Sequence, residues 1–120
     1  MAENIIKGIA INKGTVEGEV VLVDFETMNI LDAEQLKDKI VVTKSVSSNI
    51  TPIVKKVKGI VTDEGGILSH AAKIAREFNI IAIVGTKNAT QILKTGDYVE
   101  LNGETGEIHI LESRATSVDK

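Results

Sequence analysis

The segment from Gly59 to Gly85, GIVTDEGGILSHAAKIAREFNIIAIVG, constrains the fold more than any other part of the chain. Two short apolar runs within it, GIVT and IIAIV, have the length and composition of buried strands. The residues between them place an apolar stripe on one face of a helix, at i, i+3, i+4 and i+7: Ala71, Ile74, Ala75 and Phe78. A strand–helix–strand unit of this kind indicates an α/β domain.

The ends of this helix can also be predicted. Ser69 is a good N-cap, because its side-chain oxygen can accept a hydrogen bond from the first turn, and Asn79 can close the helix in a left-handed conformation. Directly before the helix, Gly65 and Gly66 allow positive φ and a tight turn. His70, one of only two histidines in the chain, is therefore expected at the start of the helix, behind a glycine turn.

The flanking segments add strands and short helices. We expect strands at 15–23 and 39–44 and a hairpin at 97–111. Short helical segments are expected at 33–37, after a Thr51 N-cap and Pro52, and after an Asn88 N-cap. The 120 residues suffice for one domain. We expect this domain at 1–111, with a mixed sheet layered with helices and a C-terminal β-hairpin, followed by a polar, flexible tail at 112–120.

Composition excludes several classes of function. The absence of cysteine rules out disulfides, thiolate nucleophiles and cysteine-based zinc sites. A net charge of -3 and only three aromatic residues argue against nucleic-acid binding. The longest apolar run, Ile80–Val84, is far too short to cross a bilayer. We therefore expect a cytoplasmic protein with neither a nucleic acid nor a membrane as partner.

The helix start has chemistry that suits an anion. Its first amides lack partners, and the helix dipole adds partial positive charge, so a phosphate would be stabilised there. His70 supplies a nitrogen nucleophile at the same point, and the dipole favours its neutral form. The simpler interpretation is that His70 is an exposed helix-start residue and that the glycines only form a turn.

Three other active sites fit the sequence less well. Acyl transfer by Ser69 and His70 requires the two side chains to face each other, which adjacent helix residues do not do. A zinc site needs three protein ligands, and only His109, Asp63 and Glu64 are candidates to assist His70. A Walker-type phosphate loop requires GK[ST] after the glycines, and that sequence is missing.

The wider stretch GIVTDEGGILSHAAKIAREFNIIAIVGT resembles the phosphohistidine motif of the PEP-utilising enzymes. This family includes phosphoenolpyruvate synthase, pyruvate phosphate dikinase, the first enzyme of the sugar phosphotransferase system and rifampicin phosphotransferase. Its pattern is a strand, then TDxGGxxSHAAxxAREx, then a strand that ends in VG. GIAINKGTVEGEVVLV and LKTGDYVELNGETGEIHIL resemble the entry and the closing hairpin of the family's mobile domain, so the resemblance covers roughly residues 7–111. The chain departs from the family at Asn12-Lys13-Gly14, often Ser-Pro-Gly, and at Ile80-Ile81-Ala82, usually Ile-Pro-Ala.

The resemblance implies a swivelling β/β/α domain in which His70 accepts a phosphoryl group and passes it on. It also implies residues that support or bind the phosphate, with no metal ligand among them: Gly65, Gly66, Ser69, Ala71 and Thr62. Arg76 is expected to have a surface or interdomain role, Asp63 and Glu64 to lie in the turn, and His109 to be an ordinary strand residue.

The family also implies partners. A nucleotide-binding ATP-grasp domain would hold ATP and Mg, and a TIM-barrel domain would hold phosphoenolpyruvate or pyruvate; this domain alone would bind no cofactor. The chain would thus be a phosphotransferase component that is not catalytically complete alone. Its initial Met and polar tail favour a stand-alone carrier over a domain excised from a larger enzyme. A non-catalytic regulatory or docking module with the same fold is the alternative.

Overall fold

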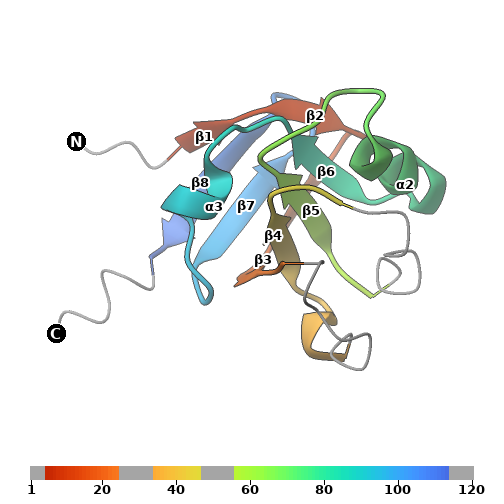
Figure 1. The fold of residues 1–120 in the computed structure, drawn as a ribbon. Coiled ribbons are helices and arrows are strands. Elements are labelled where there is room, and N and C mark those ends of the chain that lie inside the picture. Colours follow the sequence, from red (N-terminus) through yellow and green to blue (C-terminus); the bar gives the residue numbers. More distant parts are fainter. Residues whose placement is uncertain (1–4, 25–33, 47–55, 114–120) are drawn as a thin grey trace, which may run out of the picture.

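One mixed β-sheet organises the domain. The computed structural model describes residues 5–24, 34–46 and 56–113. Their strands are β1 (Ile5–Lys7), β2 (Ile9–Ile11), β3 (Thr15–Leu22), β4 (Ile40–Thr43), β5 (Gly59–Thr62), β6 (Ile81–Val84), β7 (Tyr98–Asn102) and β8 (Glu107–Glu112), and their helices are α2 (His70–Phe78) and α3 (Ala89–Ile92). The sheet order is β1-β8-β7-β3-β4-β5-β6-β2 (Figure 1). The expected α/β class and mixed sheet are confirmed.

The parallel half of the sheet positions α2. Strands β3, β4, β5 and β6 pair in parallel, and every residue of β4 and β5 is buried. Alternate residues point to opposite faces of a strand. Ile60 therefore joins a core cluster with Ala71 and Ala75 of α2, whereas Val61 joins a second cluster that includes Ala89 of α3. Burial on both faces explains why these strands read as continuous apolar runs.

The first described residues close the sheet. Strand β1 pairs with β8 at one end of the strand order and β2 pairs with β6 at the other, although only Gly8 separates them in sequence. The Gly8 amide donates to the Gly106 carbonyl at 2.8 Å, and a Cβ on Gly8 would lie 2.7 Å from the Val84 oxygen. The two ends of the sheet therefore meet at Gly8, where only a glycine fits. Neither three-residue strand was predicted individually.

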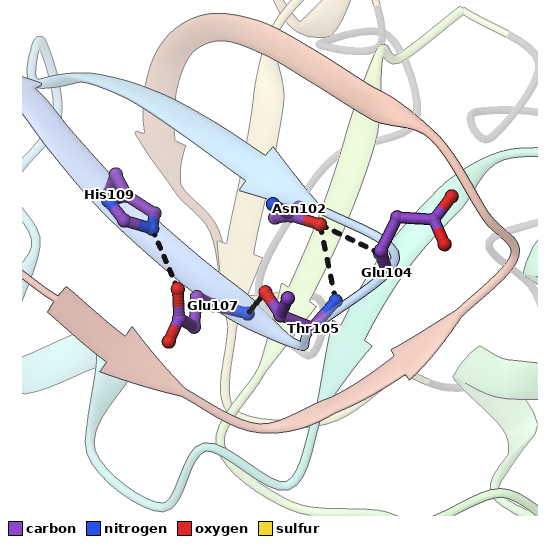
Figure 2. Close-up of polar contacts among 5 residues, drawn as sticks. All are labelled: Asn102, Glu104, Thr105, Glu107 and His109. Atoms are coloured by element: carbon purple, nitrogen blue, oxygen red, sulfur yellow. Dashed lines mark hydrogen bonds and ion pairs between the residues drawn. The ribbon is translucent and has the colours of Figure 1, made fainter.

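The predicted C-terminal hairpin is confirmed. Strands β7 and β8 are antiparallel, and the turn between them is held by the Asn102 side chain, whose Oδ1 accepts from the amides of Glu104 (2.8 Å) and Thr105 (3.2 Å) (Figure 2). His109 lies on β8 next to buried Ile108, and its Nε2 is 2.9 Å from Glu107 Oε1. It is the strand residue that the sequence predicts.

Several smaller predictions have different outcomes. Residues 34–36 form a single 3₁₀ turn within the predicted 33–37 segment, and the helix start at Thr51 and Pro52 lies outside the described residues. Asn88 occupies the N-cap position of α3, but its side chain makes no capping hydrogen bond; the Thr86 hydroxyl accepts from the Ala89 amide at 3.3 Å instead. Strand β8 ends at Glu112, and residues 114–120 of the expected tail lie outside the described part. Within the described ranges, no helix has the length and apolar character needed to cross a membrane.

Candidate functional site

Helix α2 begins and ends where the sequence predicts. Ser69 is the N-cap, with φ −69° and ψ 164°, and its Oγ accepts from the Ala72 amide at 3.2 Å. Asn79 closes the helix at φ 58° and ψ 46°, and its amide donates to the Ala75 carbonyl. The first residue of the helix is His70, and it is exposed. The imidazole is therefore placed at the helix start and open to an approaching group, as expected.

The two glycines before the helix have different roles. Gly65 has φ +113°, and a Cβ there would lie 3.0 Å from both Cβ and Oγ of Ser69. Gly66 has no positive φ, and a Cβ on it would meet nothing within 4 Å. The expectation that both glycines enable the turn is therefore correct only for Gly65. Gly85 is also required, because its φ is +69° and its Cβ would lie 2.7 Å from the Gly65 oxygen.

The loop between β5 and α2, residues 63–69, is held at its start by residues that are distant in sequence. The carboxylate of Asp63 accepts from the Thr90 amide at 2.9 Å and from the Thr90 hydroxyl at 2.5 Å. Asp63 thus caps the start of α3, a role that its expected place in the turn did not suggest. Thr62 is fully buried; its hydroxyl donates to the Glu64 carbonyl at 2.6 Å and its own carbonyl accepts from the Thr86 hydroxyl at 3.0 Å. Both residues therefore support the turn that leads to His70.

Arg76 reaches back to the same loop. Its Nη2 donates to the Ile67 carbonyl at 2.9 Å. The expected surface role is therefore incomplete, because the guanidinium of this exposed residue contacts the segment just before the helix. Sequence reasoning missed this contact because nine residues separate the two partners and the acceptor is a backbone carbonyl.

A small surface cavity of about 160 Å³ opens beside the histidine. It is lined by Ser45, Val46, Glu64, Gly65, Ser69, His70 and Ala71. Four of the predicted site residues thus come together at one cavity, whereas Gly66 and Thr62 do not line it. The carboxylate of Glu64 is the acidic group of this lining, and Lys44 Nζ lies 3.9 Å from its Oε2.

Free amides at the start of α2 suit an anion. The Ser69 hydroxyl accepts from the Ala72 amide and the Ser69 carbonyl from the Lys73 amide. The amides of His70 and Ala71 have no hydrogen-bond acceptor among the described residues. Such unpaired N–H groups, together with the helix dipole, stabilise a bound phosphate or a similar anion.

Two of the competing sites gain no support from the geometry. The Ser69 hydroxyl caps the helix by accepting from the Ala72 amide, and no hydrogen bond joins it to His70 in the described part of the chain. Over residues 5–24, 34–46 and 56–113, no group of three or more histidine, aspartate or glutamate side chains is arranged to hold a metal ion.

Comparisons with known proteins agree with the sequence motif. The family described as "PEP-utilising enzyme, mobile domain" matches residues 35–106. A probable phosphoenolpyruvate synthase from Pyrococcus horikoshii is 41% identical over 109 residues, which are 90% of this chain and 13% of that protein. A rifampicin phosphotransferase from Bacillus cereus is 37% identical over 107 residues, or 88% of this chain and 12% of that protein. The chain therefore spans about an eighth of these relatives.

Solved structures share the fold. A Thermococcus kodakaraensis aconitase X in its holo form has a TM-score of 0.68 and 28% identity, covering 90% of this chain and 98% of that chain. A solution structure of Enzyme I has a TM-score of 0.57 and 29% identity, covering 81% of this chain and 37% of that chain. One of these structures is named an aconitase and the other Enzyme I, so the same fold occurs in proteins with different names. The function must therefore be argued from the residues of the site.

Proposed function

Because the chain belongs to the family of PEP-utilising enzyme mobile domains, we propose that it is a phosphoryl carrier and that His70 is the residue that carries the group. The observation that supports this most strongly is the placement of an exposed His70 as the first residue of α2, beside a cavity and two unpaired amides. A nucleophile and an anion-binding helix end occupy the same point of the molecule.

The proposed transfer consists of two substitutions at phosphorus. In the first, a neutral ring nitrogen of His70 attacks the phosphorus of a donor; a P–N bond forms, and the donor's P–O bond breaks with its electron pair leaving on the donor oxygen. In the second, an acceptor oxygen attacks, the P–N bond breaks and the ring nitrogen recovers its electron pair. The unpaired amides of His70 and Ala71 would stabilise the phosphoryl oxygens, because they are preorganised donors.

The donor and acceptor sites are proposed to lie on partners. The relatives are much longer than this chain, so further domains accompany the mobile domain in them. From the resemblance we propose an ATP-grasp partner that holds ATP and Mg, a TIM-barrel partner that holds phosphoenolpyruvate or pyruvate, or both, in the cytoplasm. Residues 1–111 would be the carrier domain. The isolated chain is then expected to take no phosphoryl group from ATP or from phosphoenolpyruvate until a partner is added.

Phosphoramidate provides a test that needs no partner, because it is a small donor for histidine. The native chain, incubated with potassium phosphoramidate, is expected to gain one phosphoryl group by intact mass. The label should be lost in acid and survive alkali, as a P–N bond does and a phosphoserine does not. His70→Ala should abolish it, and His109→Ala, the matched control, should retain it. Both variants should remain folded, since both side chains are at least partly exposed.

A second candidate function is a non-catalytic regulatory or docking module. It is favoured by the likeness to the aconitase X structure, because this chain matches nearly all of a chain whose name is not that of a phosphotransferase. A folded chain that gains no label at His70, or that is still labelled as His70→Ala, would support this alternative and contradict the carrier.

A further inference from the structure

The side chain of Arg76 connects the body of α2 to the loop in front of it. Side chains of a helix tilt toward its N-terminus, so a long side chain can reach back over the preceding turns. Arg76 does so and donates from Nη2 to the Ile67 carbonyl at 2.9 Å. The bond thereby joins the second turn of the helix to a residue three positions before His70.

The tip of this loop has few other restraints. The tip comprises residues 66–68, and among the described residues its hydrogen bonds are the one from Arg76 and a turn bond from the Ser69 amide to the Gly66 carbonyl at 3.0 Å. Ile67 is 59% exposed and Leu68 84% exposed, so apolar burial contributes little to their order. The Arg76 bond is therefore the side-chain contact that holds the tip in place.

The order of this loop directly affects the position of His70. Ser69 is both the last residue of the loop and the N-cap of α2, so its backbone geometry sets the direction of the first amides and of His70. A displacement of Ile67 passes to Ser69 through two peptide bonds. Effective attack on phosphorus requires close alignment, and small displacements of a reacting group cost much of the rate.

Building on the proposed function, we propose that Arg76 is a positioning residue: its hydrogen bond to the Ile67 carbonyl orders residues 66–68, which lead into the Ser69 cap, and so aligns His70 for phosphoryl transfer. The competing explanation is that a cation in the last turn of α2 only stabilises the helix dipole. That explanation requires positive charge alone, whereas the proposed role requires a donor at the Ile67 carbonyl.

Three variants separate these roles. Arg76→Met removes every donor and keeps an apolar stem, and Arg76→Lys keeps the charge but replaces the planar guanidinium with an ammonium group. Lys94→Met removes the same charge from an exposed position beyond α3 and is the matched control. Neither Arg76 nor Lys94 is buried, so all three variants are expected to fold, which urea unfolding checks.

The first readout is NMR of the loop. The Leu68 amide belongs to the same peptide group as the Ile67 carbonyl, so its ¹⁵N shift reports the hydrogen bond. In Arg76→Met this shift should change, and the heteronuclear NOE of Ile67 and Leu68 should fall, while Lys94→Met leaves both as in the native chain. A loop as ordered in Arg76→Met as in the native chain would overturn the proposal.

The second readout is the rate of labelling by phosphoramidate. Arg76→Met should react about fivefold more slowly, since an exposed hydrogen bond shifts a local equilibrium by about that factor. Arg76→Lys should recover part of the rate and Lys94→Met all of it. Equal rates for Arg76→Met and the native chain, or full recovery in Arg76→Lys without recovery of the Leu68 shift, would overturn the role. A native chain that takes no label at His70 would instead overturn the proposed function itself.

Discussion

Replacing each of the two adjacent glycines before α2 with alanine should give opposite results. Gly65 has φ +113°, far from the left-handed region that other residues tolerate, and a residue held in such a conformation costs about 1–3 kcal/mol. An alanine Cβ would also lie 3.0 Å from Ser69 Cβ, so the capping residue must shift. Together these effects predict that Gly65→Ala lowers the free energy of unfolding by about 2–3 kcal/mol.

Gly66→Ala is the matched control. Gly66 has no positive φ, and its added Cβ would meet nothing within 4 Å. Alanine then mainly reduces the freedom of the unfolded chain, which predicts a stabilisation of about 0.5 kcal/mol. Both changes add the same methyl group one residue apart, so a difference between the variants reports the local backbone and not the composition.

Urea unfolding followed by circular dichroism measures both variants. Midpoints can be compared directly if the two transitions have the same slope. In thermal unfolding, Gly65→Ala should melt roughly 10 °C below Gly66→Ala, since each kcal/mol corresponds to about 4 °C in a chain of this length. Equal stabilities of the two variants, or a less stable Gly66→Ala, would refute the assignment of the strained turn to Gly65.

Three further predictions concern hydrogen bonds of single side chains. Ser69→Ala removes the N-cap of α2 and should lower the free energy of unfolding by about 1 kcal/mol in urea, with some phosphoramidate labelling retained. Asp63→Ala removes both bonds to Thr90 and should cost about 2 kcal/mol, and an unchanged urea midpoint would show that this cap contributes nothing. The hydrogen bond from Lys56 lowers the pKa of Glu34, so its small contribution to stability is present above the ordinary glutamate range and lost as the pH falls through the lowered value. A carboxyl ¹³C NMR titration should show a Glu34 pKa below the ordinary glutamate value, and Lys56→Met should return this pKa to the ordinary range.

Features encoded within a few residues of sequence were predictable. The α2 stripe and its caps depend on neighbours three or four positions apart, and the structure has both ends of the helix at the predicted residues, Ser69 and Asn79. The buried strands β4, β5 and β6 were predicted because burial on both faces gives continuous apolar runs. The same local signals placed His70 at a helix start, which is the main feature of the site.

Features that join distant residues were not predictable. Strands β1 and β2 have three residues each, too few for a periodic pattern, and they form because β8 and β6 provide edges to pair with. Asp63 caps a helix that begins 26 residues later, and Arg76 bonds a backbone carbonyl that carries no sequence signature. The unequal roles of Gly65 and Gly66 were not predictable either, because the two residues are identical and differ only in backbone conformation and in what a Cβ would meet.

The most direct measurement of the central claim is a ¹H–³¹P correlation spectrum of the chain after labelling by phosphoramidate, kept at alkaline pH. The account predicts one phosphorus signal, coupled to the ring protons of His70, with no such signal in His70→Ala. A signal that correlates with His109 or with a serine or threonine side chain, or a folded native chain that shows no bound phosphorus, would contradict it.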